Sequence, residues 1–360
     1  MPLPLITTIP SMRTLRSTLP APVALVPTMG MLHPGHLSLI RLAASSSRSI
    51  IISIYVNPTQ LSPAARRSYP ATLEADVALL ESLDAELERD GEEGGRMGAG
   101  RIEAVFAPED EEMYPCLERT EPLLTKEADA AAVTDATDVV ATDDDAGWSS
   151  KGSFVNVAPL ADGRLEGINQ PYHFIGVATV CLKLFNAVKP HRAIFGAKDY
   201  QQTVIVKTMV RDLLLDLEIL VGETVRDADG LAVSSRNVYL GRRRRRVAPV
   251  LWRALCAARD AYRDGEGRRA RLLERAAQEV SEERKRQWAL ETRDRVEFDV
   301  LYFEVSDLHS LESVERVDTS KGALLSGAIQ MLPLEDIDTA EDAGRLNGRD
   351  SVRIIDSIVL

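Results

Sequence analysis

The sequence contains few cysteines and no long apolar run. Its three cysteines, Cys116, Cys181 and Cys256, have no spacing typical of a disulfide framework or a metal site, which favours a reducing compartment. No apolar stretch approaches the length of a membrane span. The first 16 residues also lack the charged-then-apolar order of a secretory signal. We therefore expect a cytoplasmic protein with no membrane partner.

Acidic residues outnumber basic ones. The chain has 43 lysines and arginines against 55 acidic residues, which gives a formal net charge of -12. Because nucleic-acid affinity depends largely on lysine and arginine at phosphates, this balance argues against a nucleic-acid partner. A run of five arginines, Arg242 to Arg246, departs from the trend. Such a run is typical of a solvated face or a helix start, with a basic binding patch as the minor alternative.

The first 240 residues alternate between short apolar runs and segments of helical period. We expect strands at residues 23–26, 49–56, 104–107, 192–195 and 217–225, and helices from residue 37, at 73–87, at 174–188 and through 206–213. Strands that alternate with helices predict a parallel, doubly wound α/β sheet in a domain of residues 1–240.

The pattern changes after Leu240. Helical segments reach to about residue 292, and strand-like runs follow at 296–302, 323–331 and 352–360. This order predicts a smaller α+β domain at residues 241–360. Three polar stretches without a clear period, near residues 90–100, 118–152 and 333–350, predict loop insertions.

The segment Val26–His36 has the layout of a strand, a turn and a helix start. Two histidines, His33 and His36, lie beside Gly30 and Gly35 in this segment. They could be ordinary surface or core histidines, or two ligands of a metal site whose other ligands are not evident from the sequence. They could also donate N–H groups to phosphate oxygens at a helix N-terminus.

Two further segments follow expected strands and carry polar side chains. In the first, Gly196 and Lys198 precede a helix that contains Gln202. Lys198 could meet a phosphate as a point charge, although a surface ion pair with Asp199 explains it equally well. In the second, Ser234 to Arg236 follow a glycine-bearing turn, and these residues suit a mobile anion clamp or an ordinary loop.

Together and in this order, these segments resemble the pantothenate synthetase (pantoate–β-alanine ligase) family, within the nucleotidyl transferases that carry an HxGH signature. The matching segments are VPTMGMLHPGH (26–36), SIYVNPTQ (53–60), RLEG (164–167), HFIGVATVCLKLFNAV (173–188), FGAKDYQQ (195–202) and DGLAVSSRNVYL (229–240). Weaker matches are LYFEVSDLHSLESV (301–314) and RIIDSIVL (353–360). The resemblance covers most of the chain outside the three expected insertions.

The resemblance implies a Rossmann-like domain followed by a C-terminal lid domain. It also implies a two-step reaction, in which pantoate and ATP give a pantoyl adenylate and pyrophosphate. The amine of β-alanine then attacks the acyl carbon, which gives pantothenate and AMP. Mg²⁺ carried with ATP is the implied cofactor, and a cytoplasmic homodimer is the implied assembly.

The resemblance also assigns roles to residues. It implies His36, His33 and Lys198 as catalytic groups, and Gln60 and Gln202 as pantoate ligands, with Gln60 also near β-alanine. Asp76 is a candidate for the magnesium shell. The implied ATP-binding residues are Met29, Gly30, His33, Gly35, His36, Gly196, Lys198, Asp199, Val225, Val233, Ser234, Ser235 and Arg236.

The chain departs from the family pattern at several positions. Ala197 replaces a usual glutamate, Ala71 a usual arginine and Leu61 a usual phenylalanine, and Gln170 lies where the family usually has a cation. These departures put substrate affinity and rate in question more than reaction type. Two alternatives to the ligase function are a nucleotidyltransferase that uses the same segment, Val26–His36, and an inactive adenylate-binding relative. A fragment of an aminoacyl-tRNA synthetase is disfavoured by the acidic charge.

Overall fold

The structure is a computed structural model that describes residues 2–61, 63–93, 100–116, 152–161, 163–337 and 350–360. The expected insertion at 118–152 therefore lies almost wholly outside the described residues, as do large parts of the other two. Contacts within the described residues divide the chain into two compact units. The first runs to Glu223 without Lys198–Gln201, and the second contains Lys198–Gln201 and Thr224–Leu360. The segment 224–240, which we assigned to the N-terminal domain, thus makes its contacts in the second unit.

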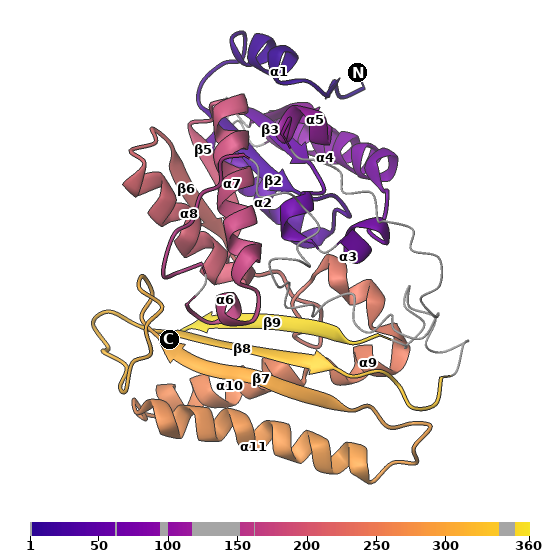
Figure 1. The fold of residues 1–360 in the computed structure, drawn as a ribbon, viewed down its shortest axis with the longest axis vertical. Helices are drawn as coiled ribbons and strands as arrows, with labels where there is room; N and C mark the ends of the chain where they lie inside the picture. The colour runs from indigo at the N-terminus through magenta and orange to yellow at the C-terminus, as the bar shows by residue number, and fades with distance from the viewer. Residues whose placement is uncertain (1, 62, 94–99, 117–151, 162, 338–349) are drawn as a thin grey trace. The chain divides into compact units, whose positions relative to one another are not determined.

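Among the described residues, six strands of the first unit form one parallel sheet in the order β1-β4-β3-β2-β5-β6 (Figure 1). The strands are β1 Leu5–Ile6, β2 Val23–Thr28, β3 Ser49–Ile54, β4 Arg101–Phe106, β5 Arg192–Gly196 and β6 Glu218–Gly222. The parallel α/β sheet expected from the alternating pattern is confirmed, and β1 is an additional strand at its edge.

Helices α2 and α4 pack on one face of this sheet. Alternate residues of β2 and β3, among them Val26 and Ile52, join Ile40 of α2 and Leu80 of α4 in a buried cluster. The helices up to Glu223 are α1 Ile9–Arg16, α2 Pro34–Ser46, α3 Pro63–Arg67, α4 Leu73–Glu93, α5 Asp110–Met113, α6 Glu166–Asn169, α7 Pro171–Val188 and α8 Tyr200–Asp212, with 3-10 turns η1 Pro58–Gln60 and η2 Ala197–Asp199. Of these, most of η2 and the first two residues of α8 belong to the second unit. Helix α4 extends to Glu93, so the loop expected from residue 90 begins later than predicted.

The strand order reverses at β2. Strands β3 and β4 follow on one side of β2, whereas β5 and β6 lie on the other. In open α/β sheets, ligands bind outside the carboxyl ends of the strands at such a switch point. Because β2 ends at Thr28 and β5 ends at Gly196, the fold brings two of the segments singled out from the sequence to this point.

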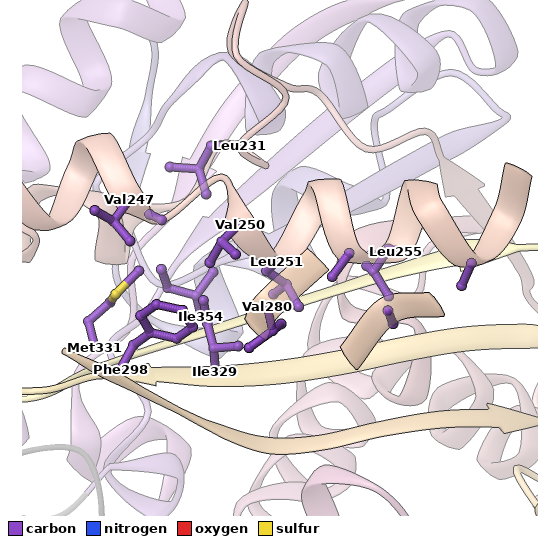
Figure 2. Packing of buried hydrophobic residues seen from close by; sticks show 14 of the residues in the cluster. Leu231, Val247, Val250, Leu251, Leu255, Val280, Phe298, Ile329, Met331 and Ile354 are labelled. Atoms are coloured by element: carbon purple, nitrogen blue, oxygen red, sulfur yellow. The ribbon is translucent and has the colours of Figure 1, made fainter. Parts of the chain in front are cut away.

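The second unit is a small α+β structure, as expected from its sequence. Within the part of it that the structure describes, three strands form an antiparallel sheet in the order β7-β8-β9, with α10 and α11 on one face (Figure 1). Its elements are η3 Ser235–Tyr239, α9 Gly241–Val247, α10 Val250–Arg263, α11 Arg269–Trp288, β7 Phe298–Ser306, β8 Leu324–Met331 and β9 Val352–Val359. In its core, Leu251 of α10 lies beside Ile329 of β8 and Ile354 of β9 (Figure 2), and Leu255 belongs to the same buried cluster.

The arginine run forms helix α9, and two of its members are buried. Arg244 has no exposed surface and donates from Nε to the carbonyl oxygen of Leu240 at 2.9 Å and from Nη2 to that of Tyr239 at 2.8 Å. Arg243 is 2% exposed and donates to the carbonyl oxygens of Arg293 and Asp336. The expectation of a solvated face is wrong for these two residues, because a guanidinium has enough donors to satisfy several loop carbonyls at once.

We expect Arg244→Ala to destabilise the protein by about 3 kcal/mol, because it leaves several buried carbonyl oxygens without their donor and opens a cavity. Urea denaturation should report this loss as a lower midpoint. The exposed neighbour Arg246 provides the matched control, and Arg246→Ala should shift stability by less than about 0.5 kcal/mol. Equal midpoints for the two variants would contradict the structural role of Arg244.

Candidate functional site

The β2–α2 loop turns sharply through two left-handed residues. Gly30 has φ +83° and Met31 has φ +52°. Thr28 fixes the start of this turn, because its hydroxyl donates to the carbonyl oxygen of Ser53 at 2.8 Å and accepts from the amide of Gly30 at 3.2 Å. A Cβ at Gly30 would lie 3.0 Å from Oδ2 of Asp76. Glycine is therefore required by both the backbone angle and the close approach of this carboxylate.

His33 is the N-cap of α2. Its Nδ1 accepts from the amide of Gly35 at 3.2 Å, so the neutral ring carries its proton on Nε2. The helix begins at Pro34, earlier than the expected residue 37, which agrees with the preference of proline for the first helical turn. His36 therefore lies inside the first turn. The rings of His33 and His36 are stacked with centroids 4.0 Å apart.

Asp76 holds the loop from the first turn of α4. Its Oδ1 accepts from the amide of Leu32 at 2.8 Å, and its Oδ2 accepts from the amide of Met31 at 2.9 Å and from the hydroxyl of Thr72 at 2.8 Å. The side chain is only 4% exposed. Because both carboxylate oxygens accept from the loop and its neighbour, these contacts favour a positioning role for Asp76 over the magnesium-shell role suggested by the resemblance.

Gln60 ends the 3-10 turn that follows β3, and its amide orientation is fixed by Asn57. The Nδ2 group of Asn57 donates to Oε1 of Gln60 at 2.8 Å and to the carbonyl oxygen of Gly176 at 3.2 Å. The Oδ1 atom of Asn57 accepts from the amide of Thr59 at 3.3 Å and from the hydroxyl of Tyr114 at 2.9 Å. With its oxygen engaged in this way, Gln60 is left with its NH₂ group to offer as a donor.

Tyr114 remains a donor over the whole physiological range. Burial raises the pKa of Tyr114 to about 12, so its hydroxyl keeps its proton and donates to Asn57. Lys183 lies 4.2 Å above the centre of the Tyr114 ring and donates to the carbonyl oxygen of Met113 at 2.6 Å. Burial lowers the pKa of Lys183. The sequence analysis assigned no role to Asn57 or Tyr114, although Asn57 begins the turn after the expected strand at 49–56.

The second segment begins at the end of β5. Gly196 is the last residue of that strand, and Lys198 and Asp199 follow in η2. Lys198 donates from Nζ to Oδ1 of Asp199 at 3.2 Å, so the simple ion pair considered from the sequence is present. Gln202 is half-buried in the first turn of α8, whereas Gln201 is 6% exposed. Gln202 is thus the more accessible amide of the two.

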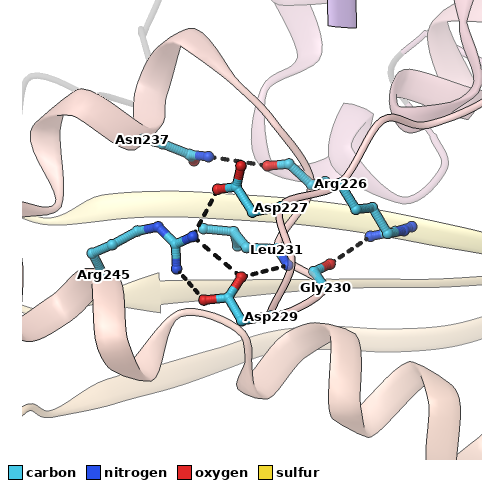
Figure 3. A network of polar contacts seen from close by, with 8 residues as sticks. Arg226, Asp227, Asp229, Gly230, Leu231, Asn237 and Arg245 are labelled. Atoms are coloured by element: carbon cyan, nitrogen blue, oxygen red, sulfur yellow. Dashed lines mark hydrogen bonds and ion pairs between the residues drawn. The ribbon is translucent and has the colours of Figure 1, made fainter. Parts of the chain in front are cut away.

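The third segment is a backbone hairpin in the second unit. The amide of Val233 donates to the carbonyl oxygen of Val225 at 2.9 Å, so the fold brings these two predicted nucleotide contacts together. Ser234 caps η3, and its Oγ accepts from the amide of Arg236 at 3.3 Å. Asn237 donates from Nδ2 to the carbonyl oxygen of Ala232 at 3.0 Å (Figure 3). Residues 234–236 are therefore held at both ends.

The described residues contain no group of three or more His, Cys, Asp and Glu side chains positioned to hold a metal ion. Over the same residues, no helix has the length and apolar character needed to cross a membrane. The residues that depart from the family pattern lie at the starts of elements or in loops. Ala197 begins η2, Gln170 is half-buried immediately before α7, and Ala71 is exposed before α4.

We expect Asp76→Asn to loosen the β2–α2 loop, because asparagine keeps only one acceptor oxygen. Its NH₂ group cannot accept from the second of the two amides, Met31 and Leu32, that Asp76 now binds. The cost should be about 1–3 kcal/mol of local stability, the penalty for unsatisfied buried donors. Hydrogen exchange of these two amides, followed by NMR, measures this change. Glu74→Gln, on the exposed side of the same helical turn, should leave both exchange rates unchanged. Slow exchange in both variants would exclude the holding role of Asp76.

Comparison with known proteins places the whole chain in one family. The family model described as pantoate-beta-alanine ligase matches residues 4–359. A pantothenate synthetase of Roseiflexus sp. (strain RS-1) is 38% identical over 328 residues, which are 91% of this chain and 96% of that protein. The enzyme of the same name from Roseiflexus castenholzii is 43% identical over 262 residues, 72% of this chain and 76% of that protein.

Solved structures agree with the sequence comparison. The crystal structure of pantothenate synthetase from Thermus thermophilus has a TM-score of 0.69 and 30% identity, and the match covers 99% of each chain. The pantoate-beta-alanine ligase of Francisella tularensis, with a TM-score of 0.59 and 22% identity, shares the fold over 99% of this chain and 97% of that one. The chain belongs to the pantoate–β-alanine ligase family.

Proposed function

We propose that this enzyme joins pantoate to β-alanine in two steps that consume ATP and release AMP. In the first step, a carboxylate oxygen of pantoate attacks the α-phosphorus of ATP and pyrophosphate leaves. In the second step, the amine of β-alanine attacks the acyl carbon of the pantoyl adenylate, and AMP leaves as the new amide forms. The family supports the overall condensation. The observation that carries the ATP-dependent route is the pair of stacked histidines at the N-terminus of α2.

The first step concentrates negative charge, because a carboxylate approaches a phosphorus that is surrounded by anionic oxygens. The N-terminus of α2 offers backbone N–H groups and the positive end of the helix dipole to that charge. His33 carries its proton on Nε2 when neutral and can donate to a phosphate oxygen. His36, in the first turn of the helix, would donate a hydrogen bond to an oxygen of the leaving pyrophosphate, where negative charge develops.

Lys198 and the hairpin of residues 225–236 would supply the remaining nucleotide contacts. Lys198 carries a compact positive charge that suits a phosphate. On nucleotide binding, its ammonium group would leave Asp199 or contact Asp199 and a phosphate together. Val225 would line the adenine pocket, while Val233 to Arg236 would close over the triphosphate. The Francisella tularensis structure, which shares this fold, is described as complexed with beta-gamma ATP and beta-alanine. That complex supports the same substrates here.

Gln60 and Gln202 would bind pantoate. Since Asn57 accepts from Tyr114 and donates to Gln60, Gln60 presents its NH₂ group, which suits a carboxylate or hydroxyl oxygen of the substrate. Once the adenylate has formed, the second step needs positioning and exclusion of water more than further charge stabilisation. Gln60 would lie near β-alanine in that step.

Asp76 does not fit the role of a protein ligand for the Mg²⁺ expected with ATP. Mg²⁺ prefers oxygen ligands, but both oxygens of Asp76 accept from the β2–α2 loop and Thr72. We assign the ion to the phosphates of the nucleotide. The cytoplasmic location and the homodimer expected from the resemblance stay predictions.

His36→Ala should lower the rate of pantoate-dependent pyrophosphate release by roughly 10²–10³, the usual cost of losing one preorganised donor to the transition state. The assay combines purified protein, ATP, Mg²⁺ and pantoate, with β-alanine added afterwards. His309→Ala, an exposed histidine of the second unit, should leave the rate unchanged. Unchanged kinetics in His36→Ala would remove His36 from the mechanism.

The same assay tests the proposed function itself. Pantoate-dependent pyrophosphate release, with AMP and pantothenate after addition of β-alanine, is the expected result for the unmodified enzyme. Binding of ATP without turnover would instead identify an inactive relative, in which Ala197, Gln170 and Ala71 are the first residues to restore. Transfer of the adenylyl group to an alcohol or nucleotide, without pantoate, would identify a nucleotidyltransferase.

Tyr114→Phe should raise the KM for pantoate by about three- to tenfold, because Asn57 loses a donor worth about 1 kcal/mol and no longer fixes Gln60 as firmly. The KM for ATP should stay within about twofold, since Tyr114 acts on the amide proposed to bind pantoate. Initial rates at saturating co-substrate separate the two constants. Tyr262→Phe, on α10 of the second unit, is a control that also removes one phenol hydroxyl. Equal pantoate constants in the two variants would refute the relay from Tyr114 to Gln60.

A further inference from the structure

The arginine run, Arg242 to Arg246, has no part in the proposed function. One of its members nevertheless contacts the hairpin of residues 225–236, which is proposed to bind the nucleotide. Arg245 of α9 donates to Oδ2 of Asp227 at 2.7 Å, and to Oδ2 and Oδ1 of Asp229 at 2.5 Å and 3.2 Å (Figure 3). One guanidinium therefore holds both acidic side chains at the tip of the hairpin. The planar fork of arginine suits such a double contact, whereas a lysine could not span it in the same way.

The hairpin tip is also fixed by its own backbone and by the core. The amide of Asp227 donates to the carbonyl oxygen of Leu231 at 2.9 Å, and the amide of Gly230 donates to that of Asp227 at 2.9 Å. Leu231 is 2% exposed and packs beside Val247 and Val250 (Figure 2). Arg226 also donates from Nη1 to the carbonyl oxygen of Gly230 at 3.2 Å (Figure 3). The tip is therefore held by Leu231 in the core, by Arg226 and by the ion pairs with Arg245.

Residues 233–236 lie in the sequence between Asp229 and Arg245, which form an ion pair. The pair Asp229–Arg245 joins positions that are 16 residues apart in sequence, and the enclosed segment contains Ser234 and η3. Closing a loop of this length removes conformational freedom from everything within it. A segment that is already ordered loses less entropy when it closes over a ligand, so preorganisation raises affinity.

The same contacts control charge near the proposed anion site. Asp227 and Asp229 are carboxylates on a hairpin whose following residues would meet a triphosphate, and like charges repel. The hydrogen bonds from Arg245 lower the pKa of Asp229, and Asp229 in turn raises the pKa of Arg245. The two groups thus stay ionised as a pair, and the cation offsets the carboxylates beside the clamp.

We propose that Arg245 is a positioning residue for residues 233–236, the proposed triphosphate contacts, which it orders through Asp227 and Asp229 without contacting ATP. This inference rests on the proposed function, because it assigns the hairpin to ATP. It gives the arginine run two separate tasks. Arg243 and Arg244 are buried and satisfy loop carbonyls, whereas Arg245 is partly exposed and holds the hairpin.

Arg245→Ala should raise the KM for ATP by about three- to tenfold and change the KM for pantoate by less than about twofold. The matched control is Arg246→Ala, which removes the same charge from the next, exposed residue. It should leave both constants unchanged. Because partly exposed ion pairs are screened by salt, the difference between the unmodified enzyme and Arg245→Ala should shrink at high ionic strength.

Hydrogen exchange of residues 225–237 provides a readout that does not depend on activity. We expect faster exchange of this segment in Arg245→Ala than in Arg246→Ala, and Asp229→Asn should reproduce the change from the other side of the contact. Equal exchange and equal ATP constants in Arg245→Ala and Arg246→Ala would overturn the positioning role. Absence of pantoate-dependent pyrophosphate release by the unmodified enzyme would contradict the proposed function instead, and the exchange comparison would still decide the role of Arg245.

Discussion

The candidate site depends on one carboxylate that holds a backbone turn. Asp76 accepts hydrogen bonds from two consecutive amides of the β2–α2 loop, and the resulting left-handed turn needs glycine at position 30. The start of α2 follows directly from this turn. Both histidines, the helix N-terminus and the backbone donors beside them are therefore positioned by a contact that reaches 44 residues along the chain. Loss of this contact would displace all of these groups together.

A similar arrangement recurs around the other polar segments. Asn57 fixes the amide of Gln60, and Arg245 fixes the hairpin that precedes Ser234. In each case, a residue with no assigned contact to substrate makes hydrogen bonds to a neighbour or a segment to which a substrate contact is assigned. Such supporting contacts are what keep functional groups within the narrow tolerances that catalysis and binding require. The proposed chemistry thus relies on a second layer of residues behind those that meet the ligands.

The sequence predicted much of the architecture because local patterns carry that information. The continuous apolar run at 49–56 predicted β3, and the regular spacing through 174–188 predicted α7. The histidine segment also identified the helix start, although Pro34 begins the helix earlier than expected. The family resemblance then supplied the reaction, which periodicity alone could not.

Contacts between distant residues could not be predicted in this way. The role of Asp76 depends on a loop 44 residues away, and that of Tyr114 on an asparagine 57 residues away. The burial of Arg244 went against the usual exposure of a charged run, because the carbonyls it satisfies become its neighbours only in the fold. These positions carry no local signature, since the same residues in another fold would have other partners.

The pantoyl-adenylate route can be tested by following the carboxylate oxygen of pantoate. If pantoate labelled with ¹⁸O in its carboxylate is converted in the presence of ATP and β-alanine, a pantoyl adenylate must leave one labelled oxygen on AMP. Mass spectrometry of the product AMP should therefore show one ¹⁸O for each pantothenate formed. Unlabelled AMP, or label in inorganic phosphate, would contradict the adenylate route and the role assigned to the α2 N-terminus.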